Sequence, residues 1–458
     1  MATKFHLPTA LLALILVVTG TLIVSSSILS ARAQTVSFRM EDFSREPLMT
    51  ETHANSDLRI ARRLQKRIEA LTGLALSPEA LIPSMRYQRD LLNHSVSVQF
   101  TSSDGKEIPL WTVRAENFPL WLRIDVTLEG VKTTLPVQNI VAELRMNPPP
   151  GIRYPVDALL IAVTEEKGVL RAQTDQVAKP GDDFDIPDAA NTVHTALTTG
   201  IPSLEIPVRT VNGRIINTTW QDLGTLELIT IGRSDFAGSG NGRKANVRKG
   251  LNRYLHNAMV PVEKPFSMNS VLKNVPISEW EMALGIFEGG ALRPVAGGGL
   301  CQVATTLYRA ILSAGFPITN RVSHSLFVTY YEKYGVGIDA TIFPGKQDLT
   351  FMNNTGYPLL IQAYTEGDEA FVAIYGTPDG RTTALEGPFF SSNAPDTIQT
   401  NGRKLRSNEI AWQQHITFPD GRAEKHTFVS RYKSIPSSIV KKYLHAAAGE
   451  AVEEKDGI

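Results

Sequence analysis

The sequence has a single cysteine among 458 residues and no excess of charge of either sign. One cysteine excludes an intrachain disulfide. The lack of disulfides is more typical of cytosolic proteins than of small secreted domains. Lysine plus arginine equals aspartate plus glutamate, at 46 each, so bulk charge gives no reason to expect nucleic acid as a partner. Hydrophobic content of 42% and charged content of 20% indicate a globular chain, and its length predicts two or three domains.

The N-terminus indicates export from the cytoplasm. Lys4 precedes an apolar run over residues 7–29, and about twenty residues at 1.5 Å each can just span a bilayer. Ala31-Arg32-Ala33 has the small-x-small form of a signal-peptidase site, with cleavage before Gln34. The run is therefore either an uncleaved membrane anchor or a cleaved signal peptide, with a buried core helix as the third alternative. Either of the first two places the body of the protein in the cell envelope.

Beyond the N-terminus the pattern predicts a multidomain α+β protein. After the signal or anchor (1–34), we expect an α+β region (35–220), a glycine-richer α+β domain (221–376), and a small β module with a flexible tail (377–458). The main expected elements are helices over 56–76 and 188–197, and strands over 95–100, 122–128, 158–163 and 201–208. A mobile loop over 237–250 is expected to lead into a short helix through Leu255, and 411–418 is expected to form a hairpin with 424–431.

Residues 56–220 contain no catalytic spacing. The acidic string over 182–185 could hold a metal, but a solvated turn is the better interpretation. His194 has no partner at useful spacing on its expected helix and is interpreted as structural.

The cysteine lies where a nucleophile would be favoured. Gly297, Gly298 and Gly299 precede Leu300-Cys301-Gln302, and the following Val303, Leu307 and Ile311 share one face of an expected helix. Cys301 then falls in the first helical turn, where free N–H groups and the helix dipole favour a thiolate. The three glycines allow a substrate close to the backbone and leave N–H groups for an oxyanion.

A cysteine nucleophile needs a base, and His324 is the best candidate among nine histidines. Asp339 could orient its imidazole across neighbouring strands, and Ser325 is the second choice. The alternative is structural: a lone cysteine on a helix is most often a small buried hydrophobe, and a glycine run is usually only a loop.

Residues from about 223 to 376 resemble the VanW family, named after a protein of vancomycin-resistance clusters. The matching segments are Gly297–Tyr308, Phe266–Asn269, His324–Ser325, Asp339–Thr341 and Phe351–Thr355. The segment Asp235–Leu255 departs from the family's asparagine-rich stretch. Residues 56–220 resemble, more weakly, the peptidoglycan-binding modules that precede such domains, and the hairpin region after Gly376 resembles the small β modules that follow them.

The resemblance implies work on peptidoglycan without a metal or organic cofactor. Some family members resemble L,D-transpeptidases, in which Cys301 would form a thioester with a stem peptide and His324 would move the protons. With water as acceptor the same machinery would be an L,D-carboxypeptidase. The candidates for contacting the substrate or its oxyanion are Gly297, Gly298, Gly299, Gln302 and Ser325. Two alternatives stay open: a non-catalytic peptidoglycan-binding or accessory protein linked to glycopeptide resistance, and an unrelated cysteine peptidase.

Overall fold

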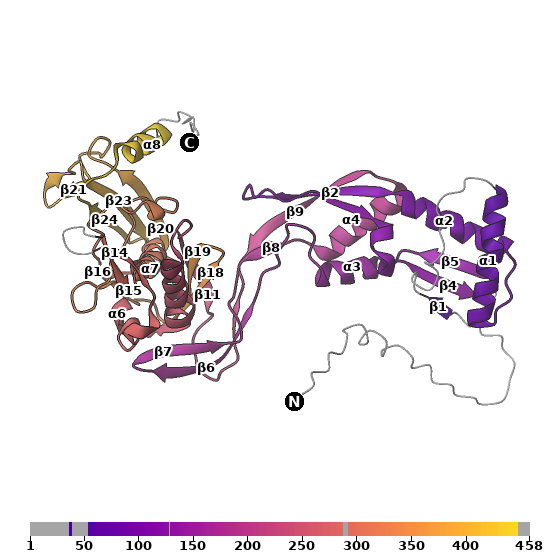
Figure 1. The fold of residues 1–458 in the computed structure, drawn as a ribbon, viewed down its shortest axis with the longest axis horizontal. Helices are drawn as coiled ribbons and strands as arrows, with labels where there is room; N and C mark the ends of the chain where they lie inside the picture. The colour runs from indigo at the N-terminus through magenta and orange to yellow at the C-terminus, as the bar shows by residue number, and fades with distance from the viewer. Residues whose placement is uncertain (1–35, 39–53, 128, 287–291, 448–458) are drawn as a thin grey trace. The chain divides into compact units, whose positions relative to one another are not determined.

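The structure, a computed structural model, describes residues 36–38, 54–127, 129–286 and 292–447 (Figure 1). The chain divides into two compact units, each described here by itself. Among the described residues, one consists of 36–38, 54–98, 111–127, 129–147 and 186–204, and the other of 99–110, 148–185, 205–286 and 292–447. Within the described ranges no helix is both long and apolar enough to cross a membrane. The expected membrane segment over 7–29 lies outside them.

The first unit combines four helices with a three-stranded antiparallel sheet of order β1-β4-β5. Its elements are α1 (Ala54–Thr72), η2 (Glu79–Leu81), α2 (Ile82–Asn93), η3 (Ala115–Asn117), η4 (Pro119–Trp121), α3 (Val137–Met146), α4 (Ile186–Thr199), β1 (Val36–Phe38), β4 (Arg123–Thr127), β5 (Gly130–Thr134) and the β3 strand (Trp111–Arg114) with the start of β2 (Ser95–Ser102). Helix α1 buries Ala61 and Ile68 against Ile124 and Val126 of β4. It ends at Gly73, whose φ of 72° is the left-handed conformation expected of a C-terminal glycine.

A seven-stranded sheet of order β10-β6-β7-β12-β18-β19-β11 forms the centre of the second unit. Its strands are β6 (Ala158–Glu166), β7 (Val169–Thr174), β10 (Ile215–Asn217), β11 (Glu227–Asp235), β12 (Ala258–Val260), β18 (Leu359–Glu366) and β19 (Glu369–Gly376). Only β10 and β6 pair in parallel; the other neighbours in this sheet are antiparallel. The predicted α+β class is confirmed.

Helix α7 (Leu300–Ala314) packs on this sheet and carries Cys301 in its first turn. Val303, Leu307 and Ile311 are fully buried, as their helical spacing predicted. The contact with β11 is close because of Gly232: a Cβ there would lie 2.2 Å from the carbonyl oxygen of Thr306. This packing fixes the start of α7 relative to the sheet.

Smaller elements surround that core. Three pairs of strands are β8 (Gly181–Asp183) with β9 (Ser203–Val211), β14 (Met282–Ile286) with β15 (Leu292–Ala296), and β21 (Gln399–Thr400) with β22 (Arg403–Lys404). Two three-stranded sheets have the orders β13 (Pro265–Ser267)-β17 (Thr350–Met352)-β16 (Ile318–Asn320) and β20 (Thr382–Phe389)-β23 (Glu409–Thr417)-β24 (Ala423–Arg431). The helices are α6 (Met268–Leu272), η6 (Ile277–Glu279), η8 (Thr329–Tyr331) and α8 (Ser437–Ala447). Strands β23 and β24 confirm the predicted hairpin.

Two local predictions were wrong. Most of the segment expected to be a mobile loop over 237–250 is helical, in α5 (Asn241–Lys249). The short helix expected through Leu255 is present as the continuation of α5, the π-helix η5 (Gly250–Leu255). Helix α5 has little apolar periodicity, and Lys244 and Arg248 pair with Asp368 instead. The acidic string is not simply a solvated turn, because its first two residues belong to strand β8: Asp182 is buried and accepts a hydrogen bond from Lys106 Nζ at 2.7 Å, whereas Asp185 follows the strand and is exposed.

Candidate active site

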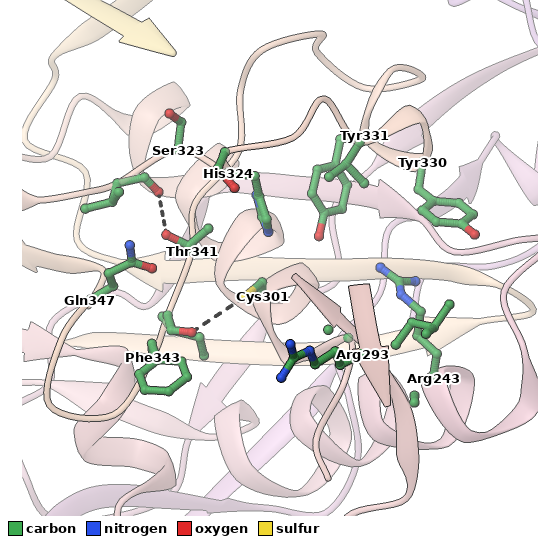
Figure 2. A pocket seen from close by; sticks show the side chains of 18 of the residues that line it. Arg243, Arg293, Cys301, Ser323, His324, Tyr330, Tyr331, Thr341, Phe343 and Gln347 are labelled. Carbon is green, nitrogen blue, oxygen red and sulfur yellow. Dashed lines mark hydrogen bonds between the residues drawn. The ribbon is translucent and has the colours of Figure 1, made fainter. Parts of the chain in front are cut away.

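A cavity of about 980 Å³ opens beside the start of α7 in the second unit. Its walls come from five stretches of chain: the start of α5, the β14–β15 hairpin, the glycine turn with the start of α7, the loops between residues 322 and 347, and Arg431 at the end of β24. Figure 2 shows Cys301 and His324 in this cavity, with the His324 ring directed toward the sulfur. The fold thus brings a nucleophile candidate and its expected base, 23 positions apart in the sequence, to one place.

The glycine turn presents the backbone of Cys301 to the cavity. Gly299 has a φ of 104°, which L side chains rarely adopt, and it precedes the first residue of α7. The N–H of Leu300 donates to Gly297 and the N–H of Gln302 donates to Gly299. Within the described chain the N–H groups of Gly299 and Cys301 have no hydrogen-bond acceptor, as expected at a helix N-terminus. These two donors are available to a developing oxyanion.

Cys301 is half-buried, and its neighbours set the ionisation of its thiol. Its S–H group donates to the carbonyl oxygen of Ile342 over 3.6 Å. Burial alone would raise the pKa of the thiol, but the hydrogen bond and the charge of His324 outweigh it, with a smaller contribution from Arg243. The pKa of Cys301 is therefore lowered, which favours a thiolate.

His324 is buried and held by one carboxylate at two atoms. Its Nδ1 lies 2.5 Å from Asp339 Oδ2, and its backbone N–H donates to the same oxygen at 2.9 Å. Burial lowers the pKa of His324, but the hydrogen bonds to Asp339 and Cys301 raise it to about 9. Asp339 responds in the opposite sense: burial raises the pKa of its carboxyl, while His324 and Arg321 lower it below its ordinary range. The three groups favour a thiolate, an imidazolium and a carboxylate.

The second oxygen of Asp339 is bound by two further side chains. Tyr432 Oη donates to Oδ1 at 2.7 Å, and Arg321 Nη2 lies 3.3 Å from the same atom. Arg321 is fixed in turn by the carbonyl of Val429 and by Ser430, which belong to β24. The C-terminal β module thus contributes directly to the orientation of the Asp339 carboxylate.

The structure separates the remaining expected site residues. Gly299 and Ser325 line the cavity, whereas Gly297, Gly298 and Gln302 do not. Gln302 is fully buried, and its Nε2 donates to Ser234 Oγ at 3.0 Å and to the carbonyl of Asp235 at 2.8 Å. Its side chain therefore ties α7 to β11 and faces away from any substrate.

Gly298 has a different requirement. A Cβ at this position would lie 2.3 Å from the carbonyl oxygen of Ala283, so the turn can press against the β14 strand only with glycine. Its role is to shape the turn.

Sequence reasoning missed four residues of the site. Arg243 and Arg293 line the cavity, and Arg321 and Tyr432 hold Asp339. Arg243 lies in the segment expected to be a loop, and Tyr432 lies beyond the family-like segment, so no local motif marked either. Among the described residues, no group of histidine, cysteine and acidic side chains could hold a metal ion.

Comparison with known proteins supports the resemblance found in the sequence. Residues 242–375 match a family model described as VanW like protein. Uncharacterized protein YoaR of Bacillus subtilis (strain 168) is 31% identical over 142 residues, which cover 31% of this chain and 46% of that protein. Residues 242–375 are therefore a VanW-like domain. The aligned part is less than half of that relative's length.

A VanW-like domain is in keeping with a cell-wall related protein and with the expected place in the cell envelope. The matched segment contains Cys301, His324 and Asp339 but ends before β20, so Tyr432 comes from outside it. No solved structure matches the chain.

The lowered thiol pKa predicts alkylation of Cys301 at unusually low pH. As the pKa of Cys301 is depressed, the thiolate persists below the pH at which an ordinary thiol protonates. Asp339→Asn removes the carboxylate that keeps His324 charged, so burial then raises the pKa of the thiol. We expect the variant to react about tenfold or more slowly with iodoacetamide at pH 7 and to recover at higher pH.

The measurement is the alkylation rate from pH 5 to 10, read by mass spectrometry on the chain's one cysteine. Asp183→Asn, which breaks an ion pair with Arg209 away from the cavity, is the matched control. Superimposable profiles for wild type and Asp339→Asn would contradict the ion-pair assignment.

Tyr432→Phe tests the support of Asp339 from the C-terminal module. The change leaves a buried carboxylate without one donor, so we expect the free energy of unfolding to fall by about 1–3 kcal/mol. Tyr334→Phe is the matched control, because Tyr334 also donates to a carboxylate, that of Glu369, but at a half-buried site where water can replace it. Chemical denaturation measures both, and equal losses would count against a special role for Tyr432.

Proposed function

We propose that this protein is a cysteine acyltransferase that acts on peptidoglycan stem peptides, as an L,D-transpeptidase. One observation carries the proposal: Cys301 and His324 line the same cavity with the imidazole directed toward the sulfur, and His324 Nδ1 lies 2.5 Å from Asp339 Oδ2. This is the arrangement of a nucleophile, its base and the group that orients the base. The family's link with the cell wall supplies the class of substrate.

In the first half-reaction the Cys301 thiolate attacks the carbonyl carbon between the third stem residue and D-alanine. The C–S bond forms, and the carbonyl oxygen takes the negative charge beside the N–H groups of Gly299 and Cys301. When the tetrahedral intermediate collapses, the C–N bond breaks and the His324 imidazolium gives its proton to the leaving amine. The products are a thioester on Cys301 and free D-alanine.

In the second half-reaction the side-chain amine of a neighbouring stem attacks the thioester carbonyl. Neutral His324 accepts a proton from this amine, the new C–N bond forms, and the C–S bond breaks to regenerate the thiolate and imidazolium. If water attacks in place of the amine, the same steps release a tripeptide and the protein is an L,D-carboxypeptidase. The acceptor alone distinguishes the two reactions.

The energetics of the site favour chemistry over binding alone. A buried carboxylate with a charged partner costs several kcal/mol of desolvation, which only a dense set of hydrogen bonds offsets. Asp339 receives such a set from His324, Arg321 and Tyr432. A groove that only binds peptidoglycan has no use for an ionised thiol, whereas an acyl transfer requires it.

Turnover of a disaccharide tetrapeptide tests the proposal. Purified full-length protein should release D-alanine and form a crosslinked dimer, both measured by liquid chromatography and mass spectrometry. Cys301→Ala should abolish both products, and His324→Gln should lower the rate about 10²–10⁴-fold, since it removes the proton-transfer group. His194→Gln, on α4 in the other unit, is the matched control and should turn over normally.

If the wild type binds the tetrapeptide but releases no D-alanine, the proposed transpeptidase activity is wrong. That result would favour a non-catalytic peptidoglycan-binding protein. Release of D-alanine with tripeptide as the sole second product would instead assign the carboxypeptidase reaction.

A further inference from the structure

The cavity beside Cys301 is basic, although the chain as a whole is neutral. Apart from Cys301 and His324, the charged side chains that line it are all cationic: Arg243, Arg293, Lys346 and Arg431. No aspartate or glutamate of the described chain belongs to the lining. With 46 basic and 46 acidic residues in the whole chain, this separation of charge is a local property of the cavity.

Not all four cations are equally available to a ligand. Arg431 is bound by Glu409, with Nε donating to Oε1 at 2.8 Å. The Lys346 ammonium lies 5.7 Å from the ring centroid of Phe343. Arg243 and Arg293, by contrast, form no ion pair with any carboxylate in the described part of the chain.

Arg243 stands apart from the other basic residues of its own helical stretch. Lys244 and Arg248 pair with Asp368, and Lys249 and Arg253 pair with Glu279. The one basic residue of this stretch that lines the cavity is thus the one whose charge is not matched by a carboxylate. An arginine without a carboxylate partner beside a nucleophile is suited to bind the carboxylate of a ligand.

The orientation of Arg243 is fixed before any ligand binds. Nη1 donates to Ser239 Oγ at 2.8 Å, and the guanidinium lies over the Tyr330 ring at 4.7 Å from its centroid. The aliphatic stem passes against Gly299, where a Cβ would lie 2.7 Å from Cγ of Arg243. The guanidinium has five N–H donors in a planar fork, and Ser239 takes one of them. The remainder match the two oxygens of a carboxylate.

Arg293 faces the same space from β15, opposite Gly285 of β14. Figure 2 shows its guanidinium and that of Arg243 around Cys301. Because Gly285 has no side chain, no neighbouring side chain on β14 covers the Arg293 guanidinium at its paired position.

We propose that Arg243, assisted by Arg293, binds the free C-terminal carboxylate of the peptide that Cys301 attacks. The substrate is then a peptide that is cleaved at the bond before its last residue. That last residue must carry a free carboxylate, and neither a terminal amide nor a further residue can replace it. This inference rests on the proposed function, because it assigns the leaving D-amino acid to a subsite of that reaction. It also makes the protein selective for stems that end one residue beyond the attacked carbonyl.

Binding to full-length Cys301→Ala tests the subsite without turnover. The ligands are a disaccharide tetrapeptide with a free terminal carboxylate, the same molecule with a terminal carboxamide, and the free-acid form with the third residue's side-chain carboxylate amidated. By isothermal titration calorimetry, the terminal carboxamide should bind about tenfold or more weakly than the free acid. The side-chain amide should bind like the unmodified peptide.

Arg243→Gln in the same background should weaken the free acid by a similar factor and leave the carboxamide unchanged. Arg253→Gln, on the same helical stretch but outside the cavity lining, is the matched control and should bind both ligands like its parent. Equal affinity for acid and carboxamide, no measurable binding of either, or a loss confined to the side-chain amide would overturn the proposal. The ligand comparison stands even if Arg243→Gln does not fold.

The outcome is separable from that of the proposed function. If the protein prefers the free acid but the wild type releases no D-alanine, the proposed enzyme activity is wrong and the carboxylate subsite is retained. If the acid and carboxamide peptides are turned over at equal rates, the enzyme activity is retained and the carboxylate subsite is wrong.

Discussion

The site depends on the ionised, buried carboxylate of Asp339. Both of its oxygens are used, one by His324 and the other by Tyr432 and Arg321. In a medium of low dielectric this carboxylate stabilises a protonated imidazole, and the imidazolium stabilises the thiolate of Cys301. Removing the carboxylate would leave a neutral thiol and a neutral ring in nearly the same positions. The ionisation of the Cys301 thiol therefore depends on Asp339, which acts on it through His324.

Close backbone packing sets the geometry on which this charge series relies. Helix α7 approaches β11 across Gly232, and its first turn is reached through glycines that admit Ala283 on one side and the stem of Arg243 on the other. Part of the support of Asp339 comes from outside the segment matched by the VanW family model: Tyr432, directly after β24, donates to Asp339, and Ser430 of β24 holds Arg321. The matched segment contains Cys301, His324 and Asp339, and the strands after it help to orient the carboxylate.

Local periodicity predicted the helix carrying Cys301, the hairpin at the C-terminus and the α+β class, because burial of one face leaves a regular pattern. Chemical reasoning also selected His324 and Asp339, whose association the structure shows, although their roles stay a prediction. The pattern could not predict α5, whose basic residues are held by distant carboxylates, nor Tyr432, which reaches Asp339 from 93 positions along the chain. Gln302 was predicted to contact the substrate, but it is buried away from the cavity. The sequence beside the cysteine does not distinguish a buried polar side chain from one that faces the cavity.

The central claim is that Cys301 forms a covalent bond with a stem peptide. The most direct measurement is the intact mass of the full-length protein, quenched in acid at short times after mixing with a disaccharide tetrapeptide and no acceptor amine. The account predicts a gain equal to the substrate less D-alanine, located on Cys301 by fragmentation. Protein of unchanged mass at every quench time, under conditions in which the peptide is bound, would contradict it.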